Sequence, residues 1–127
     1  MAQKDVRLSD IQIVIMRALW QAGRATTAEV YESVGKPRAL AYTTIATLLT
    51  RLEKRKLVKS VKQQNERVFQ PLVSEGDVTR SMVSSLVATL FQGDSSALVS
   101  HLVKDGEFTK DDLETVRKLL SKEKRNG

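Results

Sequence analysis

The sequence predicts a mainly helical protein with one small β-hairpin, an α+β arrangement, and three observations lead to this prediction. Apolar residues recur at helical spacing both before and after residues 57–72. Several of these segments open on a capping motif and end at a glycine. Residues 57–72 instead contain short β-branched and aromatic runs around a polar tip. The expected order is therefore three helices, the hairpin, and then two or three further helices.

Capping motifs mark the first two helices. Residues 9–12 form a capping box, and Gly23 supplies a left-handed stop for the helix that this box opens. A second box at residues 26–29 opens a short helix. We expect Gly35 to end that helix, because Pro37 lacks the backbone N–H that a continuing helix needs.

The third helix and the hairpin follow directly. Residues 41–56 have one apolar face, formed by Ile45, Leu48, Leu49 and Leu52. Residues 57–62 and 67–72 are the two predicted strands, and residues 63–66 form their polar tip. Pro71 cannot donate a hydrogen bond to a neighbouring strand, so we expect the second strand to end there or to lie at an edge.

Helical signals return after the hairpin. Residues 74–77 resemble a further cap, and the apolar stripe that follows is interrupted at residues 93–94. Residues 95–104 predict a short helix that stops near Gly106, and residues 109–112 cap a final helix.

The charge is divided unevenly between two predicted domains, residues 1–73 and 74–127. The first has 13 Lys and Arg against 6 Asp and Glu (net +7), the second 8 against 9 (net −1), and together they give +6. A basic half joined to a near-neutral half suggests two separate tasks. On charge alone, a solvated basic face without any partner explains the pattern equally well.

The composition disfavours several classes of protein. The chain has no cysteine, which removes disulfides and thiolate metal sites, and no apolar run is long enough to span a bilayer. We therefore expect a cytoplasmic protein that does not insert into membranes. His101 is the only histidine, without metal-ligand spacing or a nucleophile motif around it. We expect no enzymatic activity, metal or cofactor, and a hydrolase using His101 is disfavoured.

Three short helices followed by a two-stranded ribbon is the order of a winged helix-turn-helix DNA-binding domain. Residues 41–56 are then the recognition helix for the major groove, and residues 57–72 are the wing on the flanking backbone. Threonine is a poor helix former, so several threonines on one exposed helical stretch favour contact with base edges. The expected base-reading residues are Tyr42, Thr43, Thr44, Thr47 and Arg51. The expected phosphate contacts are Arg24, Thr26, Thr27, Lys54, Lys62 and Arg67.

Other interpretations of this basic half remain open. A winged-helix adaptor that binds an acidic protein partner would need a similar face. Trp20 and Tyr31 could stack on single-stranded bases, although packing explains Trp20 better and the role of Tyr31 stays open.

The second half carries an apolar stripe too broad for one helix to bury, and about 54 residues do not easily close a separate core. Pairing between two copies of the chain is the economical solution, and a two-fold dimer matches a palindromic operator. The alternative is a helical annex packed on the same chain. The expected dimerisation residues are Val78, Met82, Leu86, Leu90, Phe91, Leu98, Leu102, Leu113, Val116 and Leu120.

Several runs of residues resemble the penicillinase-repressor family over nearly the whole chain. The most specific run is residues 41–58, in which Tyr-Thr-Thr-Ile precedes a repeated leucine pattern. Further similar segments are residues 8–9, 15–20, 26–30, 91–94, 98–99 and 113–120.

The resemblance implies a dimeric transcriptional repressor that has a winged helix and a C-terminal helical dimerisation domain and binds a dyad operator. In the penicillinase branch a membrane-bound sensor protease leads to cleavage of the repressor. The corresponding region here contains His101 and Leu102 in place of the Asn-Phe pair of well-known members. The copper branch senses metal through cysteines, which this sequence lacks. A separate ligand or sensor remains an alternative.

Overall fold

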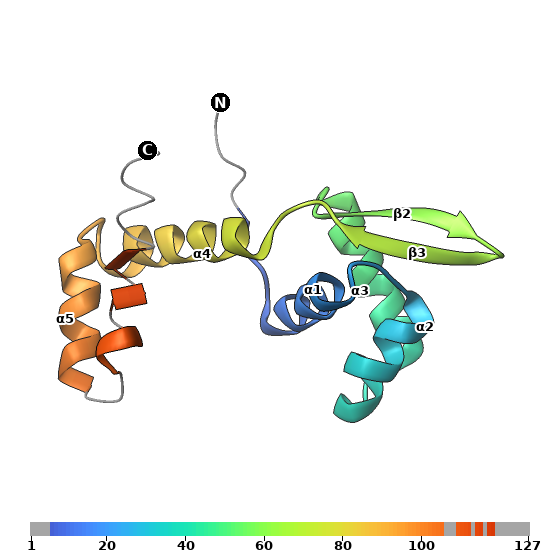
Figure 1. Ribbon diagram of the computed structural model, residues 1–127, viewed down its shortest axis with the longest axis horizontal. Coiled ribbons are helices and arrows are strands. Elements are labelled where there is room, and N and C mark those ends of the chain that lie inside the picture. Colours follow the sequence, from blue (N-terminus) through green and yellow to red (C-terminus); the bar gives the residue numbers. More distant parts are fainter. Residues whose placement is uncertain (1–5, 106–108, 113, 116, 119–127) are drawn as a thin grey trace. The chain divides into compact units, whose positions relative to one another are not determined.

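The computed structural model describes residues 6–105, 109–112, 114–115 and 117–118 (Figure 1). The chain divides into two compact units, residues Leu8–Glu75 and a second unit that joins the residues before Leu8 to those from Gly76 onward. The sequence predicts residues 1–7 within the winged-helix half, whereas Val6 and Arg7 cluster with the second unit. The N–H of Val6 donates to Ser81 Oγ over 3.0 Å, and the Val6 side chain is buried.

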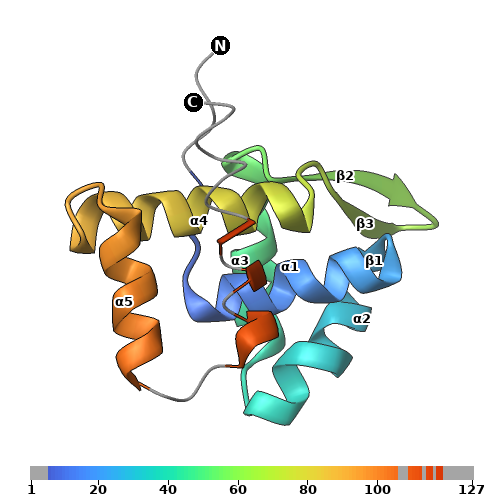
Figure 2. The same ribbon diagram turned by 60° about the vertical axis from the view of Figure 1, so that its left-hand side comes forward.

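The first unit has the predicted mainly helical composition with a small sheet. Its elements are α1 (Asp10–Ala22), β1 (Ala25–Thr26), α2 (Thr27–Val30), a π-helical turn η1 (Tyr31–Gly35), a 3-10 turn η2 (Lys36–Arg38), α3 (Tyr42–Lys54), β2 (Val58–Gln63) and β3 (Glu66–Pro71). The strands form an antiparallel sheet in the order β1-β3-β2, and Figure 2 shows β1 beside the hairpin. A fold of this kind, helices followed by a β-ribbon, is a winged helix.

Both predicted capping boxes are present. The Gln12 N–H donates to Ser9 Oγ while the Ser9 N–H donates to the Gln12 side chain, and Thr26 and Glu29 make the same reciprocal pair. Gly23 has φ +83° and its N–H donates to the carbonyl of Leu19, as the predicted stop requires. These local motifs fix where α1 and α2 begin.

The prediction that Gly35 ends the second helix is wrong. Its φ is −74°, and the helical turns continue through η2 until Ala39, which adopts the left-handed conformation at φ 56°. Gly35 is needed for close packing instead, because a Cβ there would lie 2.9 Å from Ile45 Cγ1. Pro37 is tolerated because it lies in the first turn of η2, where a missing N–H costs nothing.

The hairpin is present as predicted, but β2 begins and ends one residue later than expected, β3 begins and ends one residue earlier, and the tip is reduced to residues 64–65. Gln63 pairs with Glu66, and the two residues between them, Gln64 and Asn65, both have positive φ, which defines a type I′ turn. Pro71 ends β3 opposite Val58, as expected. The two-residue strand β1 is absent from the prediction, because two residues carry no readable alternation.

The core of the first unit lies between α1, α3 and the sheet. Its fully buried side chains include Ile15, Met16, Leu19, Ile45, Leu49, Leu52, Leu57 and Phe69. Trp20 packs beside this core, and its Nε1–H donates to the carbonyl of Val73 over 2.8 Å. The structure therefore agrees with the packing role that the sequence favours for Trp20.

The second unit contains α4 (Glu75–Leu90) and α5 (Ser95–Asp105). The chain reverses between them at Gln92 and Gly93, both with positive φ, and Asp94 Oδ1 accepts the N–H of Ala97 at the start of α5. The predicted cap at residues 109–112 is present, because Thr109 and Asp112 exchange side-chain to backbone hydrogen bonds. Within the part of the chain described here, no helix combines the length and apolar character needed to cross a membrane.

Candidate nucleic-acid interface

Helix α3, the predicted recognition helix, separates a buried face from an exposed polar face. Ile45, Leu49 and Leu52 have no exposed surface. The predicted base-reading residues Tyr42, Thr43, Thr44, Thr47 and Arg51 are all exposed. Thr43, Thr47 and Arg51 are spaced by four residues, so they form one row along the helix. The structure thus leaves the row open to a ligand, and its contact with DNA stays a prediction.

Tyr42 lies to one side of this row. Five residues of helix place it roughly 140° around the axis from Thr47. Its ring contacts that of Tyr31 with 5.6 Å between centroids and an interplanar angle of 59°, and 48% of Tyr42 remains exposed. Tyr31, whose role the sequence leaves open, therefore supports the ring of Tyr42 at the start of α3.

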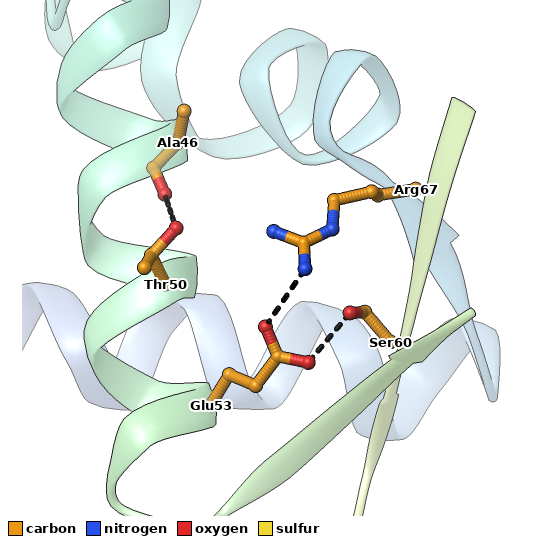
Figure 3. Close-up of polar contacts among 5 residues, drawn as sticks. All are labelled: Ala46, Thr50, Glu53, Ser60 and Arg67. Carbon is orange, nitrogen blue, oxygen red and sulfur yellow. Dashed lines mark hydrogen bonds and ion pairs between the residues drawn. The ribbon is translucent and has the colours of Figure 1, made fainter. Parts of the chain in front are cut away.

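The threonines of α3 do not all have the same role. The Thr50 hydroxyl donates to the carbonyl of Ala46 over 2.9 Å, so its proton is used inside the helix (Figure 3). Thr43, Thr44 and Thr47 make no such bond with any part of the chain that the structure describes. Their hydroxyls remain available to base edges or phosphates, and Thr50 needs no DNA contact to explain it.

The wing presents two cations toward α3. Lys62 and Arg67 are directly opposite each other on β2 and β3, so their side chains leave the same side of the sheet. Ser60 and Phe69 are the next pair on that side, and the Ser60 hydroxyl donates to Glu53 of α3. Lys54, at the last turn of α3, is also exposed. Arg67 is joined to α3 through Glu53, and we call this contact of α3 with the wing the α3–wing junction.

Glu53 connects α3 to both strands of the wing, and sequence reasoning did not identify this role. Its Oε2 accepts the Ser60 hydroxyl over 2.6 Å, and its Oε1 lies 3.6 Å from Arg67 Nη2 (Figure 3). The guanidinium of Arg67 also lies 6.0 Å from the centre of the Phe69 ring. Arg67, predicted to hold a phosphate, is thus paired with a carboxylate in this structure.

The remaining predicted phosphate contacts lie elsewhere on the unit. Arg24 and Thr26 line an open groove of about 670 Å³ whose other side is the wing tip, at Gln63, Gln64 and Glu66. Thr26 caps α2 with its hydroxyl oxygen, and Thr27 is the first residue of that helix. The residues that line this groove therefore do not include Lys62 or Arg67.

The predicted dimerisation residues fall into three groups. Val78 and Leu98 are buried within the single chain, and Met82, Phe91 and Leu102 are half-buried. Leu86 and Leu90 are 39% and 66% exposed. Val103, which is not among the predicted residues, is 57% exposed. Leu113, Val116 and Leu120 lie outside the described residues.

His101 is an exposed residue of α5, and its ring centroid lies 6.3 Å from that of Phe91. Among the residues that the structure describes, no three His, Asp or Glu side chains form a group that could hold a metal ion. The contact that the structure shows for His101 is therefore with the aromatic ring of Phe91, in the same unit.

An exposed polar helix face beside a basic wing, both held on a three-helix core, defines a winged-helix DNA-binding protein. The family model described as penicillinase repressor matches residues 8–122, so the chain belongs to the penicillinase repressor family. It is a DNA-binding transcriptional repressor.

Individual relatives agree with this assignment. The penicillinase repressor of Staphylococcus aureus is 26% identical over 95% of this chain and 96% of its own length. The transcriptional regulator BlaI of Mycobacterium tuberculosis is 30% identical over 80% of this chain and 75% of its own.

Two solved structures resemble part of the chain. The DNA-binding domain of the repressor BlaI superposes with a TM-score of 0.53 at 28% identity, covering 60% of this chain and 93% of that one. The Bacillus licheniformis BlaI monomer in complex with the blaP half-operator gives a TM-score of 0.52 at 28% identity, with the same coverage.

Proposed function

We propose that this chain is a homodimeric repressor that inserts α3 into the major groove of a dyad operator and lays the β2–β3 wing on the flanking backbone. The observation that carries this proposal is the row Thr43, Thr47 and Arg51, exposed on α3 opposite its buried face. Short threonine side chains allow the helix backbone to approach base edges, and Arg51 is long enough to pair with a guanine. Such a repressor acts where the chromosome is, so we place it in the cytoplasm.

The relatives support an operator as the ligand. The blaP half-operator is bound by a BlaI monomer whose domain resembles the first unit. A half-operator implies a second half-site, and two half-sites one or two turns apart, about 34 Å per turn, require two α3 helices in one assembly.

Footprinting on the DNA upstream of the gene for this chain tests the proposal. We expect protection of two inverted half-sites separated by about 10 base pairs or a multiple of that spacing. A protein adaptor with a basic face would instead give no discrete footprint, and its DNA binding would vanish as salt is raised. That result would contradict the repressor proposal.

The dimer interface is proposed on α4 and α5. Leu86 and Leu90 are spaced by one helical turn on α4, and Val103 is exposed on α5. Large exposed aliphatic side chains such as these are typical of surfaces that a partner covers. A second copy of the chain is the partner that a dyad operator requires.

From the resemblance to the penicillinase branch, we further propose that a sensor protease relieves repression by cutting in the region of the His101–Leu102 bond, where this sequence departs from the Asn-Phe pair of that branch. This bond lies in the interior of α5, so cleavage needs local unwinding of that helix. Intact-mass measurement of the chain from cells exposed to a β-lactam tests this step. A fragment ending at His101 is expected, and full-length chain throughout derepression would point to a separate ligand or sensor.

A further inference from the structure

The α3–wing junction contains an acidic side chain, Glu53, beside the basic wing. Glu53 faces the wing from α3 and pairs with Arg67, Lys62 lies opposite Arg67 on β2, and Lys54 follows Glu53 in the sequence; all three cations are exposed. A carboxylate beside a DNA phosphate is repelled by it, so its presence at this position needs a reason. Glu53 is also only 29% exposed, much less than Arg67 at 57%.

The two contacts of Glu53 differ in strength. The hydrogen bond from Ser60 is short, at 2.6 Å, and ties α3 to β2. The approach of Arg67 is looser, at 3.6 Å, and an ion pair with an exposed partner is weak and exchangeable. Glu53 can therefore release Arg67 while Ser60 still holds the wing to α3.

The position of Arg67 also depends on its neighbours across the strand. Lys62 is directly opposite, and two like charges in such a pair repel each other. Glu53 offsets this repulsion from one side, while the Phe69 ring lies 6.0 Å beneath the guanidinium. The cation is thus held along the junction of the wing with α3.

We propose that Glu53 is a specificity-determining positioning residue, an internal counter-ion that competes with DNA phosphate for Arg67. On DNA of arbitrary sequence the carboxylate keeps Arg67 and reduces nonspecific affinity. On the operator, where α3 is seated in the groove, a fixed phosphate at the wing replaces Glu53 as the partner of Arg67. This inference rests on the proposed function, because it assigns a role within the same DNA-binding surface.

The test is a double-mutant comparison on a random-sequence duplex, with fluorescence anisotropy measured over a range of salt concentrations. Glu53→Gln keeps an amide oxygen that accepts the Ser60 hydroxyl but removes the charge. We expect it to tighten binding by up to about fivefold, the strength of an exposed ion pair. The slope of log affinity against log salt should steepen by up to about 0.9, as for one added phosphate contact.

Arg67→Ala separates this mechanism from a general change of charge. In the wild-type background we expect it to alter random-duplex affinity less than twofold, the low end of an exposed pair. In the Glu53→Gln background it should remove the whole gain. An equal effect of Arg67→Ala in both backgrounds would overturn the proposal.

Two matched variants complete the design. Glu66→Gln removes an equal charge from the exposed turn of the same wing, so its gain should be smaller and should survive Arg67→Ala. Ser60→Ala cuts the hydrogen bond but keeps the carboxylate beside Arg67, so it should give no gain on random DNA. A Glu66→Gln gain equal to that of Glu53→Gln would also overturn the proposal, since net charge would then explain both.

The same variants on the footprinted operator test specificity. The ratio of operator to random-duplex affinity should fall in Glu53→Gln, because the operator complex already uses Arg67. An equal gain on both duplexes would refute the specificity role. If the wild-type chain protects no dyad, the proposed function fails, while the coupling of Glu53 to Arg67 on random DNA is still measured.

Discussion

At the scale of single residues, Gly35 shows that a glycine can be required by its neighbour and not by its own backbone. Its φ of −74° is open to any amino acid, but Ile45 Cγ1 and Tyr31 Cδ1 lie 2.9 and 3.0 Å from where a Cβ would stand. The contact with Ile45 sets how closely η1 approaches the recognition helix. The ring of Tyr31 in turn contacts that of Tyr42, so this glycine also affects the helix face that we propose meets DNA.

Gly35→Ala should therefore destabilise the fold through overpacking, by about 1–3 kcal/mol. Thermal or urea unfolding of the purified chain measures the change. Gly23→Ala is the comparison, because Gly23 has open space for a Cβ but φ +83°, so its cost of roughly 1–2 kcal/mol is conformational. A Gly35→Ala chain as stable as the wild type would show that η1 has room to shift.

Arg51 is the residue on which sequence discrimination should depend most. It is exposed on the same row as Thr47, and a bidentate contact with guanine is worth about 1–3 kcal/mol. Arg51→Ala should cost that amount on the operator and relax the preference at one base pair. Binding to a set of single-substituted operators measures this, and uniform weakening on every sequence would identify Arg51 as a phosphate contact instead.

At the scale of elements, the wing is the part whose function depends most on register. Lys62 leaves the side of the sheet that faces α3, whereas Lys59, three residues earlier on β2, leaves the opposite side. Lys62→Ala should reduce the slope of log affinity against log salt by about 0.9. Lys59→Ala is the matched control and should change the slope less. Equal slopes for the two variants would argue against a wing contact through the α3 side.

The elements that could be predicted from sequence are those whose signals come from residues close together along the chain. The capping boxes at Ser9 and Thr26 and the stripe of α3 use residues within one or two helical turns of each other, so spacing reveals them. Strand β1 pairs with β3 across more than 40 residues and has no local pattern of its own. The contacts of Glu53 with Ser60 and Arg67 likewise depend on the packing of α3 against a particular register, which residue spacing does not encode.

At the scale of the whole molecule, we propose that DNA binding and dimerisation belong to two different units. The exposed polar row and the basic wing belong to the first, and the exposed aliphatic side chains Leu86, Leu90 and Val103 belong to the second. A dimer that forms through the second unit lets each first unit meet one half-site. Affinity for the full operator then exceeds that for a half-site, because the second contact is intramolecular.

Leu90→Glu should separate these tasks. A charge at a position that is 66% exposed leaves the monomer folded but opposes burial against a second copy. Sedimentation at micromolar concentration should show a monomer, with full-operator affinity reduced at least about tenfold and half-site affinity unchanged. Thr89→Glu adds the same charge at the neighbouring exposed position and should remain dimeric. A Leu90→Glu dimer would place the interface elsewhere.

The docking of Val6 onto Ser81 has a topological consequence. The backbone passes between the units twice, once before Leu8 and once after Glu75, so the second unit holds chain from both sides of the first. We therefore expect a single scission between Glu75 and Gly76 to leave the two fragments joined by the contacts of Val6 with the second unit. Release of the winged-helix unit as a separate fragment therefore requires cleavage of the chain both before Leu8 and after Glu75.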